Sequence, residues 1–200
     1  MQRNWKETTH GGSIGHGFRR LVHMSMCLVP WVYYLYGDRI AHFFAFSLSQ
    51  FVGMVVGVLT LFELLRLQRG WVFFGQRQHE SHHLSSSYWS GLAMAAVLLF
   101  SPGVAYYVPL ITVYAWVDPL LGELREKGVR SKVVLLMLGF VAAGLIWWLS
   151  VHFLGASWIL GLVCAFLAVF FEQFNWRWID DNALMQLVPL GFLVCHFMLF

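Results

Sequence analysis

The sequence predicts an all-α protein in which about seven helices cross a membrane as one bundle, with the N-terminus in the cytoplasm. Of its 200 residues, 59% are hydrophobic and 12% are charged, whereas a soluble domain carries roughly 45–50% apolar and about 25% charged residues. The mean hydropathy is +0.66. A single soluble core has no room for this surplus, so the composition excludes a soluble enzyme, a nucleic-acid binder and a disordered linker.

Seven stretches have the length of a membrane-spanning helix, which needs about 20 mostly apolar residues. A short turn at 37–40 separates the first two, and Ser101-Pro102-Gly103 separates the third from the fourth, because proline ends a helix. The third and fourth stretches are the weakest, which leaves a count of six open. The stretches are residues 21–36, 41–65, 88–102, 104–121, 133–151, 156–174 and 183–200.

The positions of Lys and Arg predict the orientation of this bundle. Twelve of the thirteen basic residues fall on one side of the seven stretches, and only Arg39 falls on the other. By the positive-inside rule the basic side is cytoplasmic. We therefore expect a polar cytoplasmic segment at 1–17 and one membrane domain at 18–200, in a bacterial inner membrane or the endoplasmic reticulum.

Nearly all acidic residues fall on the same cytoplasmic side, and the turns on the other side are short and carry few charged residues. Transporters and channels need polar groups near the midplane and access from both faces. One-sided polar chemistry favours an enzyme with a cytoplasmic active site.

The cytoplasmic end of the first stretch combines two arginines with a histidine. Arg19 and His23 are four residues apart and share one helical face, and Arg20 lies beside them. Arginine side chains suit phosphate oxygens, so these residues are candidates for binding a phosphorylated ligand. Simple anchoring of the helix at the membrane interface explains the arginines equally well.

Two groups of polar residues lie near or within the polar loop at 75–90. Glu63 and Arg66 are three residues apart on the second stretch and can neutralise each other near lipid, which is mainly a structural role. Within the loop, His79-Glu80-Ser81-His82-His83 fits the H-E-x-x-H pattern of zinc proteases. No clear third ligand motif follows, so the other interpretation is a His-rich surface loop with one functional glutamate.

Asp118 places a carboxylate inside the end of the fourth stretch, next to a basic segment at 125–132. A charge in this position is costly unless it binds a cation or a basic partner. Mg²⁺ prefers oxygen ligands and commonly bridges carboxylates to phosphates. The combination of Asp118 with the basic segment predicts a site for a nucleotide and its metal ion. The alternative is that Asp118 only caps a helix before the turn.

Two acids and an amide precede the last stretch. Asp180, Asp181 and Asn182 can each cap the helix that follows, but a cap needs only one of them. At least one acid is therefore left for metal binding or proton transfer, and Glu172 lies just before the same loop.

The order of these motifs resembles the CTP-dependent polyprenol kinase family, which includes dolichol kinase, phytol kinase and the yeast-type diacylglycerol kinase and is related to the phosphatidate cytidylyltransferases. The resemblance runs from about Phe18 to the C-terminus, although Arg20 stands where the family usually has lysine. The motifs are Arg-Arg-x-x-His at 19–23, Arg-x-x-Glu at 77–80, Ser-Pro-Gly-Val-Ala at 101–105, Asp-x-x-x-Gly at 118–122, Glu172, and Ile-Asp-Asp-Asn at 179–182.

The resemblance implies a kinase-like membrane domain that transfers the γ-phosphoryl group of CTP, or of ATP, to the hydroxyl of a polyprenol, another isoprenoid alcohol or diacylglycerol. Catalysis of this kind depends on positioning and charge neutralisation. The implied partners are a membrane lipid, a nucleoside triphosphate and Mg²⁺. The implied site comprises the catalytic residues Asp118, Glu80, Asp180 and Asp181, of which Asp118 and Asp181 hold the metal; the phosphate-binding residues Arg19, Arg20, His23, Gly122 and Lys132; and the supporting residues Glu63, Arg66, Arg77, Glu172 and Asn182.

Three other functions stay open from the sequence alone. A phosphatidate cytidylyltransferase-like enzyme would use the same nucleotide and metal but release pyrophosphate. A zinc protease would use the H-E-x-x-H pattern, and a non-catalytic membrane scaffold would bind no nucleotide. Gly53 and Gly57 form a G-x-x-x-G spacing that permits close helix packing, either within the chain or in a homo-oligomer.

Overall fold

A computed structural model describes residues 9–174, 176 and 178–199, apart from the side chain of His79. The predicted all-α class is confirmed, because this part of the chain forms helices and turns, with one isolated bridge between Thr9 and Arg77. The helices are α2 (Gly12–Ser25), the 3₁₀ helix η1 (Met26–Leu28), α3 (Val29–Phe43), α4 (Leu48–Arg69), the 3₁₀ helix η2 (Gln78–His82), α5 (Ser86–Phe100), α6 (Val104–Glu126), α7 (Lys132–Leu154), α8 (Trp158–Glu172) and α9 (Asp181–Leu199).

The first helical segment differs from its prediction at both ends. Helicity begins at Gly12, so residues 12–17 of the expected polar segment are helical, and residues 1–8 lie outside the described part. The turn expected at 37–40 is wrong: α3 continues to Phe43, and the chain reverses around Ala45, whose φ is 59°. Gly37 instead allows α3 to approach α4, because a Cβ at this position would lie 3.0 Å from Leu48 Cδ1.

The break at Ser101-Pro102-Gly103 is confirmed, since α5 ends at Phe100 and α6 begins at Val104. Helix α6 then continues beyond its predicted end and includes both Pro109 and Pro119. Asp118 consequently lies in the interior of a helix, which excludes the helix-cap interpretation of this residue.

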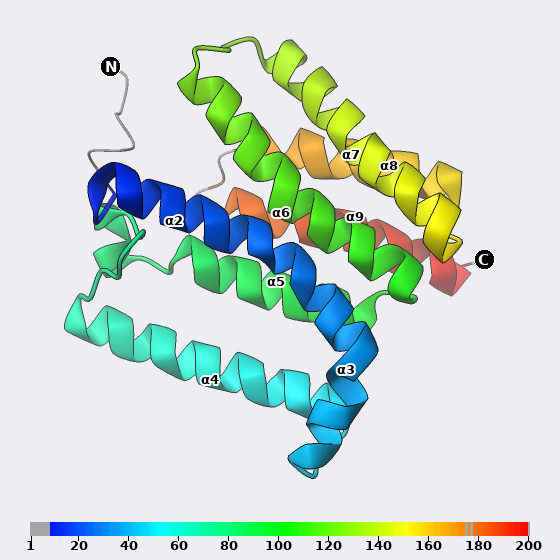
Figure 1. Ribbon diagram of the computed structural model, residues 1–200, viewed down its shortest axis with the longest axis horizontal. Coiled ribbons are helices and arrows are strands. Elements are labelled where there is room, and N and C mark those ends of the chain that lie inside the picture. Colours follow the sequence, from blue (N-terminus) through cyan, green and yellow to red (C-terminus); the bar gives the residue numbers. More distant parts are fainter. Residues whose placement is uncertain (1–8, 175, 177, 200) are drawn as a thin grey trace.

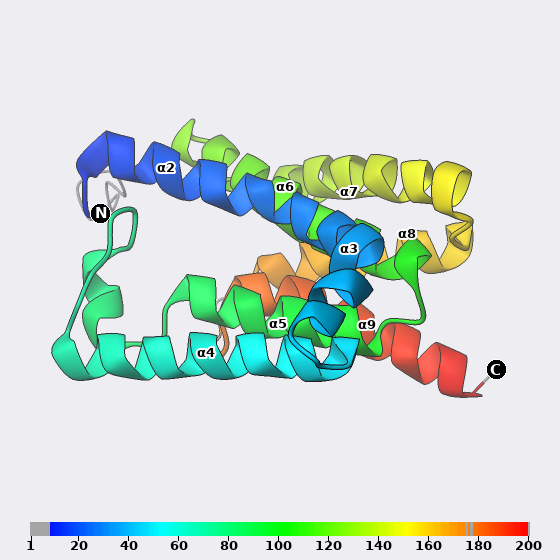
Figure 2. The same cartoon turned by 60° about the horizontal axis from the view of Figure 1, so that its bottom comes forward.

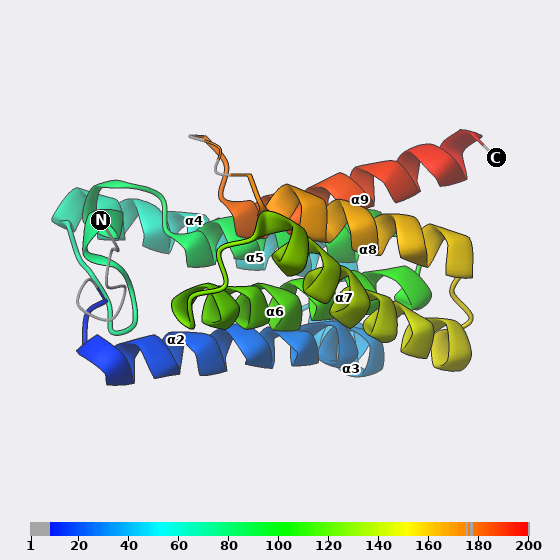
Figure 3. The ribbon, with the colours of Figure 1, turned by 90° about the horizontal axis from the view of Figure 1, so that it is seen from above.

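Successive long segments alternate in direction along the molecule (Figure 1). Helices α5, α6, α7, α8 and α9 pack around a common apolar core, while α2 lies along α6 and α4 packs on α5. Figures 2 and 3 show that α2 runs along one side of the molecule and α4 along another, and in Figure 2 α3 leads from the end of α2 down to α4. The C-terminal ends of α4, α6 and α8 and the N-terminal ends of α2, α5, α7 and α9 gather at one end, which we call the polar end.

Four helices are long and apolar enough to cross a membrane: α4, α6, α7 and α9. Two shorter apolar helices, α5 and α8, lie beside them. The outer faces of α4 and α7 carry exposed aliphatic residues such as Val58, Leu61, Met137, Val141 and Leu145. Such faces are stable against lipid rather than water, which indicates an integral membrane protein.

A buried ion pair anchors the loop at the polar end. Arg66 is fully buried, and its Nε and Nη2 donate to the two carboxylate oxygens of Glu63 at 2.8 Å. The same guanidinium donates to the backbone carbonyls of Glu80 at 2.6 Å and His83 at 2.7 Å. Glu63 in turn accepts a hydrogen bond from the backbone amide of Ser85. The pair predicted from the sequence therefore ties α4 to the loop that leads into α5.

Candidate functional site

A charged pocket of about 500 Å³ lies at the polar end, a volume typical of small-molecule sites. Six Arg and Lys side chains line it against four carboxylates, which favours an anionic ligand. The pocket contains ten of the residues singled out from the sequence: Arg19, Arg20, His23, Arg77, Asp118, Gly122, Lys132, Glu172, Asp181 and Asn182.

Three carboxylates from three different helices converge in this pocket. Asp118 of α6, Glu172 at the end of α8 and Asp181 at the start of α9 each bring one oxygen within 4.8 Å of the others. Carboxylate oxygens are hard ligands of the kind that Mg²⁺ prefers. The residues present therefore fit a magnesium ion, with Glu172 joining the two acids that the sequence assigns to the metal.

The first turn of α9 separates the roles of the two neighbouring aspartates. Asp180 Oδ1 accepts a hydrogen bond from the Asn182 backbone amide at 3.1 Å, and its Oδ2 accepts one from the Ser86 hydroxyl at 2.8 Å. Asp180 thus serves as a cap and as an anchor to α5. Asp181 Oδ1 accepts from the same Asn182 amide at 3.0 Å, but Asp181 lines the charged pocket and Asp180 does not.

Basic groups face Asp118 from α2. Arg20 Nη1 lies 3.9 Å and His23 Nε2 lies 3.6 Å from Asp118 Oδ2. His23 Nε2 also lies 3.2 Å from the carbonyl oxygen of Tyr114, which can only accept, so this nitrogen carries the proton. Arg125, further along α6, faces both oxygens of Glu172: its Nη2 donates to Oε2 at 2.7 Å, and its Nη1 is paired with Oε1. Each of these two acids therefore has a cationic neighbour.

A second group of potential ligands lies at the rim of the pocket. His16 Nε2 is 3.5 Å from Glu123 Oε1 and 3.3 Å from Glu126 Oε1. Arg20 Nε is also 3.5 Å from Glu123 Oε1. The glutamates are thus surrounded by basic groups, and the group forms an ionic contact between α2 and the end of α6.

Gly122 leaves space for Arg20 on the surface of α6. A Cβ at residue 122 would collide with the Arg20 guanidinium. We expect Gly122→Ala to displace that side chain from Asp118 and, if the pocket binds the nucleotide that the resemblance implies, to weaken this binding by about tenfold, the effect of one lost charged hydrogen bond. Nucleotide affinity of the purified variant tests this, and Gly17→Ala, at a helical position of α2 with open space, is the matched control. Equal affinities for Gly122→Ala and wild type would contradict it.

Glu80 lies outside the walls of the charged pocket. Its side chain is buried, and its Oε1 accepts a hydrogen bond from Arg19 Nη1 at 3.0 Å. Burial lowers the pKa of the nearby Arg77 guanidinium and Arg19 lowers it further, whereas Glu80 is among the acids that raise it. Glu80 therefore orients and neutralises arginines, and this placement does not favour the catalytic role that the resemblance implies.

The H-E-x-x-H segment does not assemble a metal centre in the part of the chain that is described. Residues Gln78–His82 form the short 3₁₀ helix η2 rather than an α-helix, and Glu80 is paired with Arg19. The side chain of His79 lies outside the described part. Among the side chains that are described, no metal-ligand group includes Glu80 or His83.

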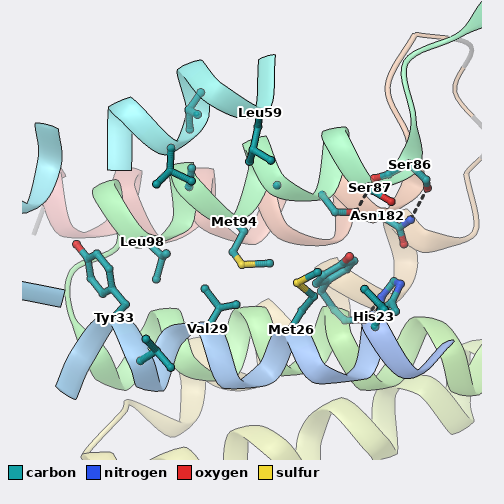
Figure 4. A pocket seen from close by; sticks show the side chains of 18 of the residues that line it. His23, Met26, Val29, Tyr33, Leu59, Ser86, Ser87, Met94, Leu98 and Asn182 are labelled. Carbon is teal, nitrogen blue, oxygen red and sulfur yellow. Dashed lines mark hydrogen bonds between the residues drawn. The ribbon is translucent and has the colours of Figure 1, made fainter. Parts of the chain in front are cut away.

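An apolar pocket of about 530 Å³ adjoins the charged one. It lies between the segment formed by α2, η1 and α3 and the pair formed by α4 and α5, and apolar residues from both sides line it, among them Met26, Leu59 and Met94 (Figure 4). Four residues line both pockets: Arg19, His23, Ser86 and Asn182. We call these four residues the shared wall.

Sequence reasoning did not find the apolar pocket or the role of Ser86. Apolar residues that line a cavity and apolar residues that face lipid have the same periodicity in a membrane helix, so no pattern distinguishes them. Ser86 lies in a serine run, Ser85-Ser86-Ser87, that reads as a loop.

The residues expected to act together thus lie together, apart from Glu80, Asp180 and the Glu63–Arg66 pair, which support the pocket from outside its walls. The resemblance to polyprenol kinases stays a prediction. When the chain is compared with protein-family models, with curated proteins and with solved structures, none of them matches it.

Proposed function

We propose that this protein is an integral-membrane lipid kinase, which transfers the γ-phosphoryl group of CTP or ATP to the hydroxyl of a polyprenol, another isoprenoid alcohol or diacylglycerol at the cytoplasmic face. The observation that carries the proposal is the shared wall, because it lets a polyphosphate in the charged pocket meet an apolar molecule in the neighbouring one. In this proposal the chain crosses the membrane seven times, with α2, η1 and α3 as the first span and the N-terminus in the cytoplasm.

The charged pocket supplies what phosphoryl transfer requires, namely positioning and neutralisation of charge. Arg19, Arg20, His23 and Lys132 bind the phosphate oxygens in the proposed complex. Asp118, Glu172 and Asp181 hold Mg²⁺, which when bound neutralises the charge of the polyphosphate.

The lipid hydroxyl attacks the γ-phosphorus while the bond from that phosphorus to the β-γ bridging oxygen breaks, and the nucleoside diphosphate leaves with the electron pair. The hydroxyl proton passes to a carboxylate. Asp181 is the candidate, since it lines the charged pocket, whereas Asp180, whose Oδ2 accepts from Ser86 on the shared wall, lines neither pocket. Glu80 is not a candidate, because it lines neither pocket.

A transfer assay with γ-labelled nucleotide and Mg²⁺ tests the proposal on detergent-purified protein. CTP and ATP are each paired with farnesol, phytol, dolichol and diacylglycerol. Label in the lipid supports a kinase and names both substrates. Release of pyrophosphate with the nucleotide joined to a lipid phosphate overturns it in favour of a cytidylyltransferase, and no transfer with any pair overturns it in favour of a scaffold.

A further inference from the structure

One polar atom on the shared wall is buried without a partner. Asn182 is 5% exposed, and its Oδ1 has no hydrogen-bond partner in the described part of the chain. A buried carbonyl oxygen of this kind is costly unless something donates a hydrogen bond to it. Asn182 lines both pockets, so its side chain lies at the boundary between them.

The neighbouring hydrogen bonds determine which way the Asn182 amide faces. The Ser86 hydroxyl donates its single proton to Asp180 Oδ2 at 2.8 Å, so the Ser86 oxygen can only accept from Asn182. Asn182 therefore turns its NH₂ group to Ser86, at 2.8 Å, and its oxygen away from it. In Figure 4 that oxygen points to the side of the pocket on which His23 lies.

The shared wall is suited to a neutral donor rather than to a second phosphate. Ser86 and Asn182 are uncharged, and in the proposed complex Arg19 and His23 are engaged by the phosphates of the nucleotide. A phosphate monoester in its dianionic form offers only acceptors and would face the unpaired Asn182 oxygen. An alcohol carries an O–H that can donate to that oxygen and an apolar chain that the adjoining pocket can enclose.

We propose that the apolar pocket binds a long-chain alcohol whose hydroxyl donates a hydrogen bond to Asn182 Oδ1. Asn182 is then the residue that selects an alcohol over a lipid phosphate or an ether. The inference rests on the proposed function, because it identifies how the lipid acceptor is oriented before its proton passes to a carboxylate. Ser86 and Asp180 hold the amide in the orientation that makes this contact.

A binding experiment without nucleotide tests the inference separately from catalysis. Radiolabelled geranylgeraniol is bound to the full chain in detergent at fixed mole fraction and displaced by unlabelled geranylgeraniol, by its methyl ether or by geranylgeranyl phosphate. We expect the alcohol to bind the wild type about tenfold more tightly than the ether, as one satisfied buried acceptor would give. Equal binding of the alcohol and its methyl ether by the wild type would overturn the inference.

The variant Asn182→Leu should reduce the affinity for the alcohol to that for the ether, while the ether itself binds within about twofold of wild type. Unchanged ether binding shows that the variant is folded. Ser87→Ala, an exposed neighbour that lines the same pocket, should keep the preference for the alcohol. A preference that survives Asn182→Leu overturns the inference.

The binding and transfer experiments distinguish failure of the inference from failure of the proposed kinase function. An alcohol preference that depends on Asn182 in a protein that transfers no phosphoryl group would support the inference and overturn the kinase. Phosphoryl transfer to lipid alcohols with no role for Asn182 in binding would overturn the inference alone.

Discussion

Replacing Asp118 by Asn is expected to lower phosphoryl transfer at least about 100-fold, the scale seen when one charge-stabilising group is removed from an active site. The carboxylate is grouped with Glu172 and Asp181 and faces the basic groups of α2. An amide keeps the shape but not the charge, so both the metal and the orientation of Arg20 should suffer. The measurement is the initial rate of label transfer over a series of Mg²⁺ concentrations.

Asp38→Asn is the matched control for this experiment. Asp38 is an exposed acid on α3, away from the residues that line the charged pocket. Its replacement should leave the rate within about twofold of wild type, as expected for a surface change. A rate for Asp118→Asn equal to that of the control would remove Asp118 from the metal site.

Replacing Arg66 by Met is expected to destabilise the protein by about 3–5 kcal/mol, because Glu63 then becomes an uncompensated buried charge. Three backbone carbonyls also lose their donor: those of Trp71, Glu80 and His83. For a chain of this length the loss corresponds to a decrease in Tm of about 6–20 °C. Thermal unfolding in detergent measures it, and proteolysis should become faster in the loop at 71–85.

Two further variants isolate the buried pair. Arg69→Met removes an exposed arginine one turn away, 4.7 Å from the Trp71 ring centre, and should cost about 1 kcal/mol or less. Combining Glu63→Met with Arg66→Met removes both charges and should recover part of the loss. A Tm for Arg66→Met within about 2 °C of wild type would show that the pair does not hold the loop.

The order of helices could be predicted from hydropathy, because long apolar stretches have few alternatives in a membrane. The break at 101–103 was equally accessible, since proline and glycine act locally. The turn at 37–40 was not, because Asp38 and Arg39 suggest a loop whereas Gly37 serves tertiary packing against Leu48. The residues next to Gly37 in the sequence therefore suggest a turn, whereas the actual role of Gly37 depends on its contact with another helix.

The sequence could predict which residues belong to the site, but it could predict less well which of them contact one another. Polar residues in a membrane protein stand out because burying them is costly. The pairing of Glu80 with Arg19 and the convergence of Glu172 on Asp118 depend on how helices pack. The choice between Asp180 and Asp181 depends on which one caps α9. Neither property leaves a trace in sequence spacing.

The charged pocket joins the first and the last helices of the described chain, and Ser86 and Asn182 are hydrogen-bonded although they lie 96 positions apart. Because synthesis delivers the N-terminal part of a chain first, α2 reaches the membrane surface with its arginines while Asp181 and Asn182 are still being translated. The pocket is therefore assembled in order, and its three converging carboxylates are incomplete until α9 has been synthesised. Under the proposed function, nucleotide binding then requires the complete, inserted protein.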